Sequence, residues 1–283
     1  MQIWIGTSGY SYADWVGPFY PPGIRPNRML AYYCGHFPLV ELNFTFYHPP
    51  TAAMLARIAE QTPAGFQFLV KLPRSLSHEE SAQDLPGFRQ AIEELERRQQ
   101  LAGLLCQLPQ ASHHEDRHKD WLEKLAGELA GYPLAVEFRH HSWFRPEMAD
   151  WLGDRKLDLV AVDVPDLPGL YPRGLVQSGP LVYVRFHSRN AENWYRSDKD
   201  RYDYHYDDAA MIEWIEALTL TADRTQRVLL LFNNCQRSQA VENARRMREL
   251  LQRLAPGFDV VTPFAAPQPS VRQRSLFGEA DTV

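Results

Sequence analysis

The stretch Leu181-Val182-Tyr183-Val184-Arg185-Phe186-His187 is a short apolar run that turns polar at its end, and the chain contains seven more runs of this kind. Runs that are apolar on both faces are typical of parallel strands covered by helices. The expected strands are Ile3–Thr7, Leu39–Phe44, Phe66–Lys71, Leu101–Gln107, Leu134–Phe138, Leu157–Asp163, Leu181–His187 and Val228–Asn233. Eight strands with helical patterns between them predict an α/β fold, the (β/α)₈ TIM-like barrel, since an open doubly wound sheet usually has fewer strands.

Residues that cap helices stand at the start of several segments between these strands. Thr51, Asp207 and Ser238 each precede apolar residues at helical spacing, so we expect helices to begin there. No linker or composition shift divides the chain, and residues 1–255 are therefore expected to form a single barrel domain. Residues 256–283 are rich in Pro, Gln and Ser, which favours a flexible C-terminal tail.

The composition is that of an ordinary globular protein, with 45% hydrophobic and 23% charged residues. A net charge of −5 argues against a protein that coats nucleic acid. Cys34, Cys106 and Cys235 are scattered, which is more typical of the reducing cytoplasm than of a disulfide framework. The N-terminal residues contain neither a basic leader nor a long apolar run, so we expect a cytoplasmic protein without a membrane partner.

Polar and charged side chains gather at the ends of the expected strands, which in a barrel converge on one mouth where active sites are found. The expected catalytic residues are Glu41, Glu137, Asp163 and His187, and the expected ligand-binding residues at the strand ends are Asn43, Lys71, Gln107, Arg139, Arg185 and Asn233. Burying so many ions without function costs several kcal/mol for each unpaired one. The set therefore indicates a functional pocket, although each residue alone is equally consistent with a polar cap on a packed barrel.

The residue types in this set suit acid–base chemistry on an anion. Glu41, Glu137 and Asp163 can act as general acids or bases, and His187 as a proton shuttle. The cations can hold a carboxylate or phosphate. The carboxylates and His187 would also suit a divalent metal, but the neighbouring cations disfavour one, so no metal ligand is assigned.

Aromatic residues are frequent in the loops that follow the strands. Tyr10, Trp15, Tyr47 and Trp143 are expected to contact a flat or ringed ligand beside the cations. The alternative is that such rings pack the loops onto the barrel rim. The loop of residues 188–206 is both charged and aromatic, and the sequence leaves open whether it is a lid or a packed rim.

Several of these segments together resemble the YecE-like family, a domain of unknown function. They are Gly6-Thr7-Ser8-Gly9-Tyr10, Val40-Glu41-Leu42-Asn43 with Phe46-Tyr47, Phe68-Leu69-Val70-Lys71 with His78, Gln107-Leu108-Pro109, Val136-Glu137-Phe138-Arg139-His140 with Trp143, Asp163-Val164-Pro165, Tyr183-Val184-Arg185-Phe186-His187 and Phe232-Asn233-Asn234. The resemblance covers nearly all the chain before the tail and implies a TIM-like barrel with its characteristic residues, His78 among them, at the mouth. Ser188 departs from the family's usual Gly. The family has no established activity, so the resemblance implies no reaction.

Two cofactor patterns are too weak to assign. His114-Glu115-Asp116-Arg117-His118 matches the H-E-x-x-H zinc pattern, but its polar surroundings favour an exposed first helical turn. Gly6-x-x-Gly9 is too short for a dinucleotide fingerprint, and no P-loop occurs. The cofactor therefore stays unknown.

The tail contains Gln273-Arg274-Ser275-Leu276-Phe277, which resembles the short bacterial motif that binds the DNA sliding clamp. Leu276 and Phe277 would fill an apolar pocket, with Gln273 and Ser275 as its polar positions. The alternative is that the two apolar residues dock on the barrel itself.

Two functional hypotheses follow from these residues. The first is an enzyme, a hydrolase or isomerase, that acts on a polar, anionic, ringed ligand such as a phosphosugar, a nucleotide or a nucleic-acid end. The second is a non-catalytic binding or accessory protein that the tail tethers to the sliding clamp in replication or repair.

Overall fold

The computed structural model describes residues 1–264, without the side chains of residues 198 and 199. Its strands are β1 (Gln2–Ser8), β2 (Leu39–Leu42), β3 (Gln67–Lys71), β4 (Leu101–Gln107), β5 (Leu134–Glu137), β6 (Leu157–Asp163), β7 (Leu181–Phe186) and β8 (Arg227–Phe232). Each strand pairs in parallel with the next one, and β1 pairs with both β2 and β8. These pairings close an eight-stranded parallel barrel, which confirms the predicted fold.

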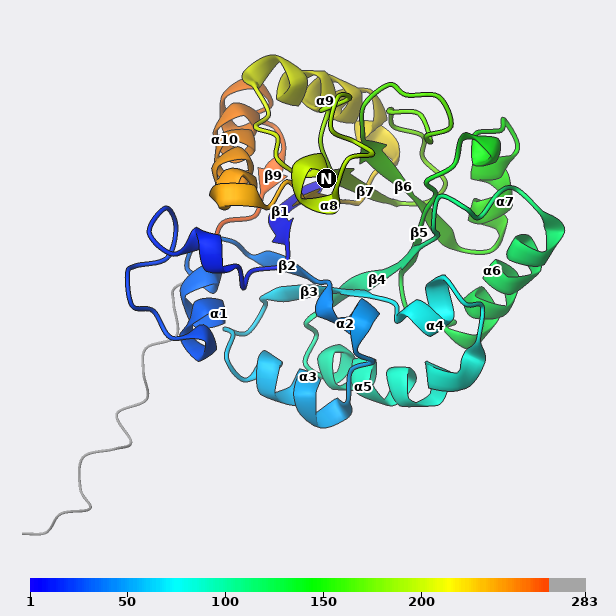
Figure 1. Ribbon diagram of the computed structural model, residues 1–283, viewed down its shortest axis with the longest axis horizontal. Helices are drawn as coiled ribbons and strands as arrows, with labels where there is room; N and C mark the ends of the chain where they lie inside the picture. The colour runs from blue at the N-terminus through cyan, green and yellow to red at the C-terminus, as the bar shows by residue number, and fades with distance from the viewer. Residues whose placement is uncertain (265–283) are drawn as a thin grey trace, which may run out of the picture.

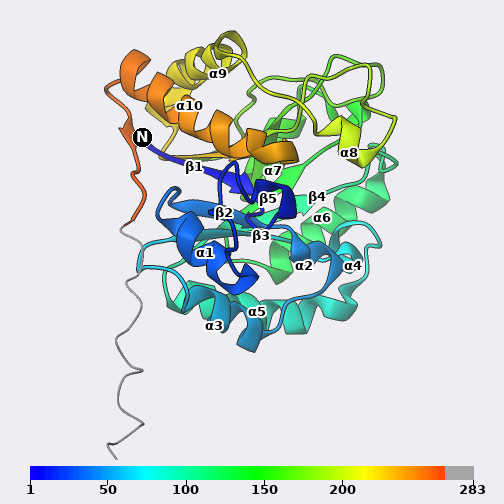
Figure 2. The same ribbon diagram turned by 60° about the vertical axis from the view of Figure 1, so that its left-hand side comes forward.

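Helices surround the strands as an outer ring (Figure 1). They are α1 (Pro26–Cys34), α2 (Phe44–Tyr47), α3 (Ala52–Ala59), α4 (Arg74–Ser77), α5 (Leu85–Arg97), α6 (Asp116–Glu128), α7 (Met148–Asp154), α8 (Asp198–Arg201), α9 (Asp208–Thr221) and α10 (Gln239–Leu254). The short helices α2, α4 and α8 lie at the end of the barrel where the strands finish, opposite the N-terminus (Figure 2).

Two of the three expected helix caps form hydrogen bonds. The Thr51 side chain accepts from the Met54 backbone N–H at 3.2 Å, and the Asp207 carboxylate accepts from that of Ala210 at 2.8 Å. Ser238 also precedes its helix, but it adopts a left-handed φ of 65° and its side chain makes no cap bond. The expected strand Leu39–Phe44 is too long, because the chain after Leu42 turns into α2.

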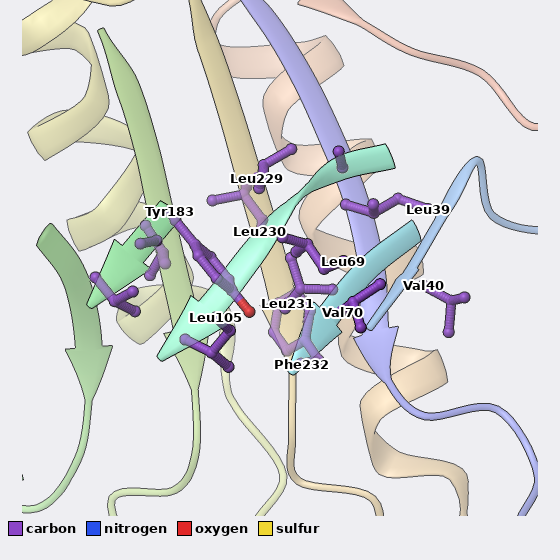
Figure 3. Close-up of a cluster of buried hydrophobic side chains, with 14 of the residues drawn as sticks. Leu39, Val40, Leu69, Val70, Leu105, Tyr183, Leu229, Leu230, Leu231 and Phe232 are labelled. Carbon is purple, nitrogen blue, oxygen red and sulfur yellow. The ribbon is translucent and has the colours of Figure 1, made fainter. Parts of the chain in front are cut away.

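Leucine, valine and aromatic side chains from neighbouring strands fill and surround the barrel (Figure 3). Leu39, Leu69, Tyr183 and Leu231 are each at most 1% exposed, and burying such a side chain contributes about 1.5–3 kcal/mol. Gly6 allows β1 to approach β2 closely, because a Cβ atom at this position would lie 2.1 Å from the Leu39 carbonyl oxygen. The packed interior leaves the strand ends as the place for a site.

Ordered structure continues beyond the boundary predicted at residue 255. A short strand, β9 (Asp259–Val260), pairs in parallel with β1, and Phe264 packs against the core. The barrel therefore includes residues that the composition assigned to the tail. The tail motif of Gln273, Ser275, Leu276 and Phe277 lies outside the described residues. None of the helices in residues 1–264 is long and apolar enough to cross a membrane.

Candidate functional site

Two adjoining cavities open at the mouth of the barrel, above the C-terminal ends of the strands. The inner lobe, of about 320 Å³, is lined by Tyr12, Asn43, Tyr47, Lys71, Gln107, Arg139, Arg185, Tyr202, Asn233, Cys235 and Gln236. The outer lobe, of about 390 Å³, is lined by Phe46, Tyr47, Lys71, His78, Gln107, Pro109, Gln110, Arg139, Leu170, Trp194, Arg201 and Tyr202. Each volume is large enough for part of a small-molecule ligand.

Arg185, on β7, is held from two sides by buried carboxylates at the base of the inner lobe. Its Nε and Nη2 donate to the two carboxylate oxygens of Glu41 at 2.9 and 2.6 Å, and Nη1 donates to Glu137 at 2.6 Å. The hydroxyl of Tyr183 also donates to Glu41. Both carboxylates are fully buried and Arg185 is 1% exposed. These bonds use three of the five N–H donors and fix the plane of the guanidinium at the wall of the inner lobe.

Glu137 also accepts a hydrogen bond from Arg139, two residues further along the chain. Burial raises the pKa of Glu137, but the positive charges of Arg139 and Arg185 outweigh it and hold that pKa well below its ordinary value. Glu137 therefore stays ionised at neutral pH. It holds two arginines in place and is a poor proton donor or acceptor, which corrects the acid–base role expected from the sequence.

His187 lies beside this cluster with its ring fully buried. The amide nitrogen of Asn233 lies 2.9 Å from Nδ1, and because an amide nitrogen only donates, the ring proton belongs on Nε2, which faces a Glu137 oxygen at 3.4 Å. Burial and the charge of Arg139 lower the pKa of His187 to about 3. The imidazole is neutral at physiological pH and lines neither lobe, so it does not fit the predicted proton shuttle.

Lys71, at the end of β3, is the titratable group on the cavity wall that is tuned closest to neutral pH. Its Nζ donates to the Gln107 side chain at 2.8 Å and lies 4.4 Å from the centre of the Phe46 ring. Burial, together with the nearby charge of Arg185, lowers the pKa of Lys71 to about 8, against the opposing effect of the two glutamates. Lys71 can therefore exchange a proton near neutral pH.

The surface that faces the lobes is cationic and rich in amides. Lys71, Arg139 and Arg185 contribute positive charge, and Asn43 and Asn233 contribute amides. In the part of the chain that the structure describes, no carboxylate lines either lobe. The mouth therefore presents donors and positive charge to a ligand, while the balancing negative charge lies buried beneath it.

Asp163 does not belong to this site. Arg189 donates to both of its carboxylate oxygens, at 2.8 to 3.1 Å, and Tyr206 and Trp214 donate to it as well. In the strand register Asp163 pairs with Phe186, the residue after the inward-pointing Arg185. Asp163 therefore points outward, to the layer between the barrel and α9, and its predicted catalytic role is wrong.

The four predicted aromatic contacts divide into one that faces the cavity and three that pack. Tyr47 lines both lobes and is 73% exposed. Trp15 and Trp143 are fully buried, and their indole nitrogens donate to backbone carbonyls at 2.7 and 2.8 Å. Tyr10 packs near Tyr33 and lines neither lobe. Packing of the rim, the alternative interpretation, holds for these three.

Other predicted residues lie where the sequence placed them, on the cavity wall. Asn43, Gln107 and Asn233 line the inner lobe. His78 lines the outer lobe, where burial and the charge of Lys71 lower its pKa to about 4.

The loop of residues 188–206 contributes wall residues that the prediction did not include. Trp194, Arg201 and Tyr202 line the outer lobe, and α8 lies over the mouth in Figure 1. Arg201 donates through Nε to the Trp194 carbonyl at 2.8 Å. The density of aromatic residues in this loop was the available signal, but it does not distinguish rings that line a cavity from rings that pack. Tyr12, after β1, is another wall residue of the same kind.

The H-E-x-x-H segment has two different environments. His118 is buried and paired with Glu80, whereas the ring of His114 lies 5.0 Å from that of Trp143. The expectation of an exposed first helical turn is therefore wrong for His118. Among residues 1–264, no group of three or more His, Cys, Asp or Glu side chains is arranged to hold a metal ion.

Comparison with known proteins extends the resemblance noted in the sequence. The model of a family described as "Protein of unknown function DUF72" matches residues 4–269. The UPF0759 protein YunF of Bacillus subtilis is 29% identical over 271 residues, which cover 88% of this chain and 95% of that protein.

Solved structures of the same family share the fold. A DUF72 family protein from Thermotoga maritima, TM1631, is 36% identical, with a TM-score of 0.82 over 89% of this chain and 100% of that chain. A DUF72 family protein from Enterococcus faecalis, EF0366, is 26% identical, with a TM-score of 0.79 over 88% of this chain and 95% of that chain.

Proposed function

The chain belongs to the DUF72 family of proteins of unknown function, and from the geometry of its mouth we propose that it is an enzyme, a hydrolase or isomerase, acting on an anionic, ring-bearing small molecule. The observation that carries this proposal is the separation of charge at the mouth. Three cations, Lys71, Arg139 and Arg185, line the inner lobe, and Glu41 and Glu137, which pair with the arginines, are buried below.

The arginines hold the anion in this proposal. Arg185 is clamped by Glu41 and Glu137, so that its remaining N–H donors are fixed before a ligand arrives. Arg139 is fixed by the same Glu137. Preorganised donors bind an oxyanion without the cost of ordering flexible side chains. The glutamates are positioning residues, because both are fully buried and neither lines a lobe.

Lys71 carries the proton transfer. With a pKa of about 8, its ammonium form can donate a proton to a leaving oxygen, and its neutral form can remove one from a water or a carbon acid. Gln107 and the Phe46 ring hold the amine at the cavity wall. The same residue serves hydrolysis and isomerisation, so the reaction type follows from the substrate.

A substrate screen with matched lysine variants tests this proposal. Phosphorylated sugars and nucleotides are first ranked by the thermal shift that they cause, and turnover of those that bind is followed by NMR. We expect Lys71→Met to lower kcat at least a hundredfold, the usual contribution of a general acid or base. Lys124→Met, on the exposed face of α6, should stay within twofold. Turnover that survives in Lys71→Met would refute the assignment, and binding without turnover would favour the accessory-protein hypothesis.

The sequence of residues 273–277 supports a second, independent proposal, that this segment binds a DNA sliding clamp. A pull-down that compares the full chain with one ending at residue 266 tests it. Recovery of clamp only by the full chain is expected, and equal recovery by both chains contradicts it.

A further inference from the structure

Two of the cations on the cavity walls lie at the junction of the two lobes, whereas Arg185 lines only the inner lobe and Arg201 only the outer one. Tyr47, Lys71, Gln107, Arg139 and Tyr202 line both cavities. Two of these five residues are cations. An anion bound between them therefore has free space on both sides, whereas a terminal phosphate needs space on one side only.

The inner lobe offers hydrogen-bonding groups that match hydroxyls. Asn43, Asn233 and Gln236 carry amides that both donate and accept. The Asn43 Oδ1 atom is buried and accepts no hydrogen bond from any described residue. A buried acceptor without a partner destabilises the protein, because it has lost its hydrogen bonds to water. A ligand hydroxyl would supply the missing donor, so the inner lobe fits a hydroxylated group such as a sugar.

The outer lobe differs from the inner one by two apolar rings, Phe46 and Trp194, that the inner lobe lacks. Gln107 and Gln110 carry amides on its wall as well. Phe46, Tyr47 and Trp194 stand on its wall, and the rings of Phe46 and Tyr47 meet edge to face at 5.0 Å. The Tyr47 ring is 73% exposed, so much of it is free to stack on a ligand. Stacking on such a ring stabilises a bound base. This lobe therefore fits a planar aromatic group.

From this arrangement we propose that the ligand is a two-armed phosphate, a phosphodiester or pyrophosphate that joins a hydroxylated group to an aromatic one. The bridging anion lies at the junction beside Lys71 and Arg139, the hydroxylated arm enters the inner lobe and the aromatic arm enters the outer lobe. This inference rests on the anion site of the proposed function and narrows it, because a monoester would leave one lobe empty.

Four probes separate the contributions of the arms in calorimetric titrations of the full chain. They are inorganic pyrophosphate, glucose 1-phosphate, uridine 5′-monophosphate and uridine diphosphate glucose. We expect the last to bind at least tenfold more tightly than each of the other three. If pyrophosphate binds but uridine diphosphate glucose binds no better than the one-armed probes, the two-armed ligand is refuted and the anion site stands. If no probe binds, pyrophosphate included, the anion site falls as well.

Single substitutions assign the arms to the lobes. Tyr47→Ala should lower the affinity for uridine diphosphate glucose and for uridine 5′-monophosphate about tenfold. The affinity for pyrophosphate should stay within twofold of the wild-type value. Asn43→Ala should lower the affinity for uridine diphosphate glucose and for glucose 1-phosphate, but not the affinity for uridine 5′-monophosphate. Phe144→Ala removes a ring that is 57% exposed and lies outside both lobes, and it should change none of the affinities. Equal effects of Tyr47→Ala and Phe144→Ala on uridine diphosphate glucose would contradict the assignment.

Discussion

Two carboxylate–arginine clusters lie at neighbouring strand ends, and they differ in which side of the barrel wall they occupy. Inside the barrel, Glu41 and Glu137 hold Arg185. Outside it, Asp163 holds Arg189, beneath α9. The inner cluster has a cavity above it, whereas the outer one is enclosed by the Tyr206 and Trp214 side chains that donate to it.

The difference shows that one step along a strand decides whether a charged residue belongs to a site or to the scaffold. Val162 pairs with Arg185, and Asp163 pairs with Phe186. Because side chains alternate between faces, the last residue of β6 faces outward while Arg185 faces inward. Both clusters pair arginine with buried carboxylate, yet Arg185 lines the inner lobe and Arg189 lines neither lobe.

The largest expected effect separates the two arginines. Arg185→Met leaves the fully buried Glu41 without its cation and Glu137 with Arg139 alone, and it should lower the free energy of unfolding by about 3–5 kcal/mol. Arg189→Met leaves Asp163 with two neutral donors and should cost only about 1–3 kcal/mol. Urea denaturation of both variants measures the difference. An equal loss of unfolding free energy in both variants would mean that the arginine contributes no more to stability in the inner cluster than in the outer one.

Asp163→Asn tests whether the outer cluster is separate from the site. The variant weakens the pairing with Arg189 and should lower the free energy of unfolding by about 1–3 kcal/mol. The affinity for pyrophosphate should stay within twofold, because Asp163 faces away from both lobes. A tenfold loss of affinity for pyrophosphate in a folded variant would show that Asp163 contributes to the site after all.

Asp158, a buried carboxylate outside both clusters, sharpens the comparison because no cation is paired with it among residues 1–264. It lies near the start of β6, where burial raises its pKa to about 7. A hydrogen bond from the Leu181 backbone acts in the opposite direction and lowers the pKa. The unfolded value is about 3.9. Its stabilising contribution is therefore complete below pH 4 and is lost as the pH rises towards 7.

Asp158→Asn should accordingly be more stable than the wild type at pH 8, by about 1–2 kcal/mol, with the gap closing towards pH 4. Thermal unfolding at both pH values measures it. A gap that does not change with pH would show that the Asp158 charge is paired after all.

The fold was predictable because a barrel is identified by the number of its strands and by their apolar pattern, and both can be read directly from the sequence. All eight strands were located, and the errors lie at element ends, as at Phe44 and at residues 256–264. Local turn preferences decide these ends, and the pairing of β9 with β1 joins the two ends of the described chain.

The site was predictable only in part, because strand register and burial decide which polar residues line the cavity. Lys71, Arg139 and Arg185 follow from their places at strand ends, but nothing within β6 distinguishes an inward Val162 from an outward Asp163. The neutral state of His187 arises from burial beside Arg139. Trp143 and Tyr47 are both loop aromatics, and their opposite roles depend on packing between loops far apart in sequence.

The affinity of a phosphate monoester between pH 7 and 9.5 tests the central claim most directly, since the ligand stays a dianion over this range. As Lys71 loses its proton near pH 8, the wild type should bind about tenfold more weakly. Lys71→Arg keeps its charge and should bind equally well throughout. A wild-type affinity that does not change with pH, or an identical decline in Lys71→Arg, would contradict a cationic mouth tuned by Lys71.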